Sequence, residues 1–212
     1  MSSSTLVAAD HAYTSTKARI VSGELAGGTL LSEAQVGTEL GVSRTPVHEA
    51  FLRLADEQLL ELIPRRGAVV RPITPTEAAD VLAMRRGIEN TSAEQVFARG
   101  GVDADLRQRL AANLERQQTL VGSGDAGAFA EADDEFHALM IEASANPIAR
   151  HFYAQLSGRQ QRLRNVWLRI DPDNLAAAHA DHEQLAAHLI GGDRSAFTSV
   201  LAAHFDKYQG AL

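Results

Sequence analysis

The sequence predicts a mostly α-helical fold in two domains, an N-terminal winged helix-turn-helix over residues 10–73 and an all-α bundle of six helices over residues 74–212. Three observations predict it. Residues 31–60 contain two short helical patterns of apolar residues joined by a tight turn, and the apolar stretch that follows is interrupted by Pro-Arg-Arg-Gly, which is typical of a hairpin. From Thr74 onward the apolar periodicity is helical and no strand pattern competes with it.

The N-terminal segment, residues 1–9, is rich in Ser, Thr and Ala and offers little to pack, so we expect a disordered tail. A first helix is predicted over residues 10–22, with Tyr13, Lys17 and Ile20 along one side.

Residues 31–60 carry start and stop signals for two helices. Ser32 is placed to cap the first, with Gln35 three residues later to reach back to the cap, and Gly41 can take the left-handed conformation that ends it. Ser43 is placed to cap the second helix, whose apolar face is made by Val47, Ala50, Phe51 and Leu54. The residues that such a helix presents to the DNA major groove lie near its start, and here they are Ser43, Arg44, Thr45 and His48.

The hairpin that follows is predicted to be a wing. Arg65 and Arg66 at its tip can approach the DNA backbone or minor groove, and Gly67 lets the main chain come close. A hairpin with solvated arginines and no DNA contact is the alternative.

The second domain opens with Thr74-Pro75-Thr76-Glu77, a capping box with proline at the first helical position. Breaks rich in Gly, Asn, Asp and Pro divide the rest into six predicted helices, at residues 75–99, 103–121, 125–144, 147–170, 172–190 and 194–209.

The composition limits the class of protein. There are no cysteines, which excludes disulfides and thiolate metal sites, and there is neither an apolar run long enough for a membrane span nor an export signal, so we expect a cytoplasmic protein. The net charge of -7 is uneven, because residues 1–72 hold seven basic and eight acidic residues and the remainder 13 and 19. The DNA-binding part is therefore close to neutral. We expect each winged helix-turn-helix domain, which we call a head, to bind DNA with modest affinity, so that two heads are needed.

Polar residues interrupt the apolar stripes of three helices in the second domain. His182 and His204 each occupy a position where an apolar residue is expected, and Asp133 and His137 lie one turn apart beside an apolar face. One carboxylate and three neutral imidazoles suit a divalent metal, with zinc first and nickel or manganese as alternatives. Buried histidines that only hydrogen-bond their neighbours are the other interpretation.

Two stretches resemble known families. SRTPVHEAFLRL resembles the SRTPVREAL.RL signature of the GntR family of bacterial transcription regulators, and the likeness covers residues 12 to 72. His48 stands where that family usually has Arg, Gln58 where it commonly has Gly, and Ala26 where it has Pro.

The second domain resembles the FCD ligand-binding domain of one GntR subfamily, which is FadR-like. DDEFHALMIEASANPIA is similar to its D..FH..L..ASGN segment, and residues 181–205 to its closing segment. Carried over by position, the family's metal ligands fall on Asp133, His137, His182 and His204. The resemblance also implies that Arg85, which shares a helix with Glu89, faces an effector cavity, although an ordinary surface ion pair fits the same spacing. Arg159, Arg162, Arg164 and Arg169 form a charged run that we expect to be solvated or at an interface.

We therefore expect a ligand-responsive DNA-binding regulator, a repressor, that binds a palindromic operator as a homodimer and responds to a small carboxylate at the metal and Arg85. We expect no enzyme and no membrane association. The alternatives are a metal-dependent hydrolase and a regulator whose metal is purely structural. Neither an HExxH motif nor a G-x-S-x-G elbow occurs in the sequence.

Overall fold

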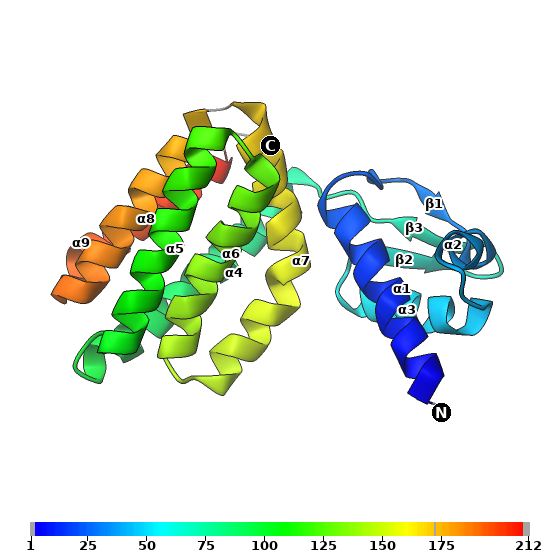
Figure 1. Cartoon of the computed structure of the whole chain (residues 1–212), viewed down its shortest axis with the longest axis horizontal. Helices are drawn as coiled ribbons and strands as arrows, with labels where there is room; N and C mark the ends of the chain where they lie inside the picture. Colours follow the sequence, from blue (N-terminus) through cyan, green and yellow to red (C-terminus); the bar gives the residue numbers. More distant parts are fainter. Residues whose placement is uncertain (1–2, 172, 210–212) are drawn as a thin grey trace. The chain divides into compact units, whose positions relative to one another are not determined.

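The computed structural model describes residues 3–171 and 173–209, and the chain divides into two compact units, Met1–Thr74 and Pro75–Leu212 (Figure 1). No helix among these residues combines the length and the apolar character that crossing a bilayer requires. Each unit is described by itself.

The N-terminal unit is a winged helix-turn-helix, as predicted. Its elements in chain order are α1 (Ser3–Val21), β1 (Leu30–Leu31), α2 (Glu33–Leu40), α3 (Arg44–Asp56), β2 (Leu60–Ile63) and β3 (Gly67–Val70). The antiparallel sheet has the order β1-β3-β2, with Leu60 opposite Val70 and Leu31 opposite Ala68. The predicted apolar face of α3 is buried in the core of this unit, against α1 and the sheet.

In the N-terminal unit, one predicted segment is wrong and one strand was not predicted. Residues 3–9, expected to be a disordered tail, belong to α1, while residues 1 and 2 lie outside the described part. Ala9 of this segment is buried, and alanine favours a helix. β1 was not expected, because a strand of two residues is too short to show an alternating pattern.

Of the predicted start and stop signals of α2 and α3, the stop of α2 forms as predicted and the two N-terminal caps do not. Gly41 adopts the left-handed conformation at φ +67°, and the amide of Val42 donates to the carbonyl of Gly37, which closes the end of α2. Ser32 and Ser43 do occupy the N-cap positions, but neither side chain makes a capping hydrogen bond. The predicted capping contact between Ser32 and Gln35 is therefore absent.

The C-terminal unit consists of six helices, and the structure confirms the predicted ranges to within two residues at each end. They are α4 (Pro75–Ala98), α5 (Ala104–Ser123), α6 (Ala126–Ala143), α7 (Pro147–Ile170), α8 (Asp173–Gly191) and α9 (Arg194–Gln209). Side-chain caps begin four of them: Asp103 accepts from the amide of Leu106, Asp125 from that of Ala128, Asn146 from those of Ile148 and Ala149, and Asp193 from that of Ala196.

The six helices form a closed ring of neighbours in the order α4, α7, α6, α5, α8, α9 and back to α4 (Figure 1). Each helix therefore has an inward face, and the apolar part of the interior includes Phe129, Phe136, Leu185, Phe197 and Phe205. The interior is not purely apolar. Every helix of the ring also turns a buried polar side chain inward, and this feature positions the candidate site.

Candidate metal centre and DNA-reading face

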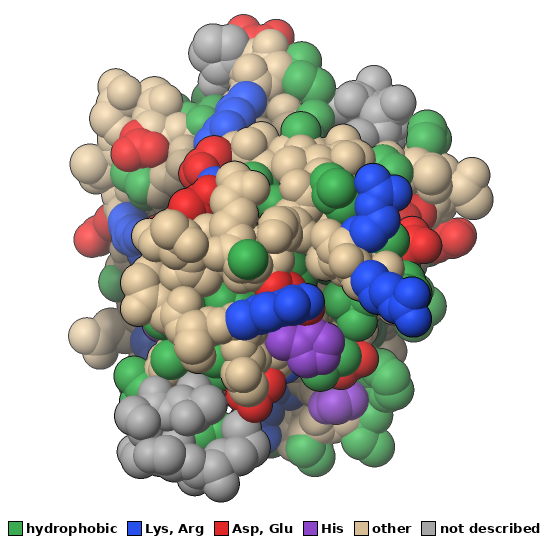
Figure 2. Space-filling view, turned by 90° about the vertical axis from the view of Figure 1, so that its right-hand side faces the viewer, with side chains coloured by type: hydrophobic (Ala, Val, Ile, Leu, Met, Phe, Trp, Pro, Cys, Tyr) green, Lys and Arg blue, Asp and Glu red, His purple; other side chains and the backbone are tan. Residues whose placement is uncertain are grey.

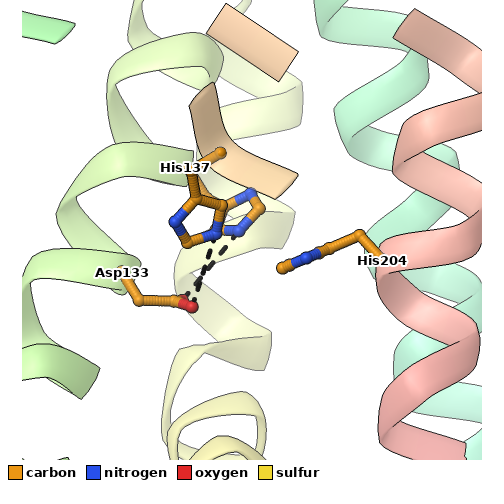
Figure 3. Close-up of side chains that lie close together, drawn as sticks. Asp133, His137 and His204 are labelled. Atoms are coloured by element: carbon orange, nitrogen blue, oxygen red, sulfur yellow. Dashed lines mark ion pairs between the residues drawn. The ribbon is translucent and has the colours of Figure 1, made fainter. Parts of the chain in front are cut away.

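Asp133, His137, His182 and His204 lie together inside the C-terminal unit. Each offers one ligand atom, and these four atoms all lie within 4.8 Å of one another. All four side chains are fully buried. The first two come from α6, His182 from α8 and His204 from α9, and the side chains labelled in Figure 3 point toward a common centre.

Each histidine of the cluster is held through Nδ1, so that Nε2 faces the centre. His137 Nδ1 lies 2.7 Å from Glu89 Oε2, His182 Nδ1 lies 2.7 Å from Gln117 Oε1, and His204 Nδ1 lies 3.1 Å from Asp181 Oδ2. Fixing the far nitrogen of a ligand histidine in this way is usual at metal sites. These three partners come from α4, α5 and α8.

The electrostatics of the cluster suit a cation. Burial lowers the pKa of His137 and of His182 well below the usual value, which keeps both imidazoles neutral. Burial would raise the pKa of Asp133, but the nearby guanidinium groups, Arg164 above all and also Arg85, hold it well below its usual range, so the carboxylate is charged. A charged carboxylate and neutral imidazoles are the protonation states in which these side chains bind metal ions.

The cluster also passes a test of fit for a metal. The Nε2 atoms of His137 and His182 are buried and have no hydrogen-bond partner among the described residues. His204 Nε2 has only a long contact of 3.4 Å with the hydroxyl of Tyr208. Unpaired buried polar atoms are costly, and a metal ion bound to these nitrogens would remove that cost.

Two arginines lie beside Asp133. Arg85 donates through Nε to Glu89 at 2.7 Å, while its Nη2 lies 3.9 Å from Asp133 and has no hydrogen-bond partner among the described residues. Arg164 Nε lies 2.5 Å from Asp133 Oδ2. The Arg85–Glu89 pair is therefore buried and does not lie on the surface, and the expectation that Arg164 belongs to a solvated run is wrong.

Asp134 and His179 lie close in sequence to the candidate ligands but do not join the cluster. Asp134 points away from the cluster and accepts from Gln161 and Arg164. His179 contacts the carbonyl of Leu114 and not a ligand. Gln117 and Asp181 were not predicted as hydrogen-bond partners of the histidines. Their positions in the sequence do not distinguish them from other polar residues of an amphipathic helix.

The candidate DNA-reading face lies between α3 and the wing. A groove there is lined by three of the predicted contact residues at the start of α3, Arg44, Thr45 and His48, and by residues of the wing that include Arg65 and Gly67. Ser43 and Arg66 are exposed and do not line this groove. Gly67 has φ +108°, and a Cβ atom there would lie 2.1 Å from the carbonyl oxygen of Leu31, so packing against β1 requires glycine at this position.

Glu33 at the start of α2 bridges two of these residues. Its carboxylate accepts from Arg44 Nε at 2.5 Å and lies 2.7 Å from His48 Nδ1. Arg44 itself remains 70% exposed at the side chain, so its outer nitrogens are free to contact a ligand. On the face shown in Figure 2 the basic side chains lie dispersed among neutral and acidic ones, in keeping with the near-neutral charge of residues 1–72.

Comparison with known proteins agrees with this architecture. The model of the gntR family of bacterial regulatory proteins matches residues 8–70, and that of the FCD domain matches residues 80–207. The chain is 30% identical over 161 residues to the HTH-type transcriptional repressor RspR of Escherichia coli (strain K12), covering 74% of this chain and 69% of that protein. It is 29% identical to the gluconate operon transcriptional repressor of Bacillus licheniformis, covering 92% and 80%.

Solved structures share the fold of the whole chain. That of E. coli McbR/YncC has a TM-score of 0.81 at 21% identity, with 94% of each chain covered. A transcriptional regulator GntR from Rhodococcus sp. RHA1 has a TM-score of 0.80 at 19% identity, with 95% of each chain covered. The chain therefore belongs to the GntR family of bacterial transcription regulators, in the FadR-like subfamily that carries a C-terminal FCD domain.

Proposed function

We propose that this regulator is a repressor that acts as a homodimer, and that its helical unit binds a divalent metal ion together with a small organic acid. The observation that carries the proposal is the buried cluster of three inward-facing Nε2 atoms and one charged carboxylate. The donor set of nitrogen and oxygen suits zinc, with nickel and manganese as alternatives. Such an ion supplies positive charge and open coordination positions for an anionic ligand.

Polar groups beside the cluster support an organic acid as the effector. Arg85 Nη2 lacks a partner, and Gln160, which is 1% exposed, has no partner for either of its amide atoms among the described residues. Gln160 precedes Arg164 by one turn of α7 and therefore shares its face. A carboxylate with a second polar group would satisfy guanidinium and amide together, because arginine pairs readily with carboxylates.

An exposed apolar stripe supports association with a second copy of the chain. Ile148, Phe152, Val166 and Ile170 lie at spacings that place them on one side of α7, and Met84 is exposed on the neighbouring α4. Five large apolar side chains between 48% and 67% exposed are typical of an interface. Two heads brought together in this way would each read one half-site of a palindromic operator.

Regulation requires that the effector bind one arrangement of the two heads better than the other, since only that difference shifts DNA affinity.

A metal-dependent hydrolase fits the site less well. Both oxygens of Glu89 are engaged, by Arg85 and His137, and Asp181 is engaged by His204 and Lys207, so neither carboxylate is free to act as a general base.

The metal is tested by elemental analysis of purified protein. We expect one divalent ion per chain in the wild type and none in the His182→Ala/His204→Ala double variant, while His188→Ala on the same helix α8 serves as the control because His188 lies outside the cluster. Full metal content in the double variant would refute the assigned site.

DNA reading is tested by selection from a random duplex library followed by binding measurements. We expect Arg44→Ala to lower affinity for the selected duplex while leaving affinity for random duplex within about threefold, because a base contact is worth about 1–3 kcal/mol. The control is Arg53→Ala, also on α3, whose side chain packs on the ring of Tyr13 in α1. An equal loss on both duplexes would contradict base reading by Arg44.

The response to an organic acid is tested with acetate and malonate as probes. A purely structural metal predicts that zinc removal lowers the melting temperature while neither probe changes DNA binding. The proposal predicts that at least one small carboxylate changes DNA affinity in the zinc-loaded wild type and that this effect disappears in Arg85→Met.

A further inference from the structure

His182 differs from the other two histidines of the cluster in what holds its Nδ1. The partners of His137 and His204 are the carboxylates of Glu89 and Asp181, which can only accept a hydrogen bond when ionised, so Nδ1 must donate. The partner of His182 is the side-chain amide of Gln117 at 2.7 Å. An amide can present either its oxygen or its NH₂ group, so the position of the proton on His182 depends on which way Gln117 faces.

A chain of hydrogen bonds determines that orientation. The backbone carbonyl of Ala132 can only accept, and Asn113 Nδ2 lies 3.0 Å from it. Asn113 therefore turns its Oδ1 toward Gln117 Nε2, which donates to it at 2.6 Å. Gln117 Oε1 is then left to face His182, and His182 Nδ1 must carry the proton.

The alternative orientation is strongly disfavoured. Asn113 Nδ2 also donates to the carboxylate of Glu135 at 3.2 Å, so reversing Asn113 would place its oxygen against two acceptors. Gln117 is fully buried, so water cannot replace its lost bond, whereas Asn113 borders a solvent-open pocket and its orientation is set by the two acceptors. The direction of the chain is thus set by a backbone carbonyl and a carboxylate, both of which can only accept.

The chain also ties together elements that supply the ligands. Asn113 and Gln117 lie one turn apart on α5, which contributes no ligand of its own. They connect His182 on α8 with the carbonyl of Ala132 on α6, the residue that precedes the ligand Asp133. Helix α5 packs against both α6 and α8 and holds them in register at this point.

We infer that Gln117 and Asn113 are positioning residues for the metal centre, which fix His182 as the tautomer with its proton on Nδ1 and its Nε2 lone pair directed at the ion. The inference rests on the proposed binding of a divalent metal. A histidine with the opposite tautomer would present an N–H group to the ion and could not ligate it through Nε2. With the proton on Nδ1 of His182, all three imidazoles would bind the ion through Nε2.

The experiment compares the zinc affinity of full-length variants by competition with a chelator, with zinc alone as the probe. We expect Gln117→Leu and Asn113→Leu each to bind zinc about tenfold more weakly or worse. Gln117→Glu keeps an acceptor for Nδ1, and its affinity should lie closer to that of the wild type than does that of Gln117→Leu.

The matched control is His179→Leu. His179 on α8 also bonds to α5, through the carbonyl of Leu114 at 3.2 Å, so this variant removes a hydrogen bond between the same two helices without contacting a ligand. We expect its zinc affinity to stay within about twofold of the wild type. Equal zinc affinities in the Gln117→Leu and His179→Leu variants would overturn the inference.

A second measurement does not depend on the variants folding. Nitrogen chemical shifts of the histidine rings in the metal-free wild type should show His182 neutral with its proton on Nδ1, and zinc should shift its Nε2. A proton on Nε2, or zinc bound through Nδ1, would overturn the inference. Wild-type protein that takes up none of zinc, nickel and manganese would overturn the proposed metal binding and the inference with it, whereas metal uptake insensitive to Gln117→Leu would overturn the inference alone.

Discussion

Ala145, in the turn between α6 and α7, has φ +49°, a backbone conformation that disfavours any residue with a Cβ atom. It aligns with the glycine of the ASGN segment quoted above. We predict that Ala145→Gly stabilises the helical unit. The left-handed conformation costs alanine about 1–2 kcal/mol, which glycine avoids. The greater conformational freedom of glycine in the unfolded chain offsets about 0.4–1 kcal/mol of this gain. Since the exposed methyl group loses little packing, the net gain should be about 0.5–1 kcal/mol.

The assay is urea denaturation of the metal-free full-length protein followed by tryptophan fluorescence. Trp167 is the single tryptophan of the chain and is buried in α7, so the signal reports the helical unit alone. The control is Ala111→Gly, at an exposed position in the interior of α5, which should destabilise by about 1 kcal/mol because glycine disfavours a helix. Equal losses in both variants would show that the backbone of Ala145 carries no strain and refute the reasoning.

Three further predictions concern other parts of the molecule. Gln58, before β2, has φ +61°, so Gln58→Gly should also relieve backbone strain, but it removes a hydrogen bond from Arg71. We therefore expect a smaller gain in stability of the N-terminal unit than Ala145→Gly gives the helical unit. Hydrogen exchange of amides in α3 measures this gain, and a larger one would contradict the prediction. Burial would raise the pKa of Glu33, but hydrogen bonds from Arg44 and His48 hold it below its usual value. Its contribution is therefore present above the unfolded pKa of about 4.3 and is lost as pH falls through the folded pKa, so Glu33→Gln should weaken the acid dependence of that exchange, and an unchanged profile would contradict the assignment. Arg164→Met should destabilise the metal-free helical unit by about 3–5 kcal/mol, because it leaves a buried carboxylate without its nearest cation; a loss below 1 kcal/mol in urea denaturation would contradict this.

The elements of the fold could be predicted because the signals for them are local. Helix periodicity, the proline and glycine breaks and the left-handed stop at Gly41 each depend on residues a few positions apart. The same holds for the candidate metal ligands, since Asp133 and His137 share a helical face by spacing and His182 and His204 interrupt apolar stripes. β1 was missed because two residues show no alternating pattern. The first turns of α1 were missed because residues 3–9 contain too few apolar side chains to show a helical periodicity.

The supporting residues of the centre could not be predicted. The bonds of His137 to Glu89 and of His182 to Gln117 join positions 48 and 65 residues apart. Which side chain of one helix meets which of another depends on the rotation and axial offset of packed helices, and spacing within a single helix contains no information on either. Arg164 shows this most clearly, because nothing in its run of arginines distinguishes the one that is fully buried.

The amino-acid sequence by itself determined the class of protein, the two domains and the inward-facing positions of Asp133, His137, His182 and His204, because hydrophobic periodicity and motif spacing are properties of short segments. Only the tertiary structure decided the hydrogen-bond partners of the histidines and of the buried arginines. Those depend on which donors and acceptors six helices bring within hydrogen-bond distance once water is excluded from between them.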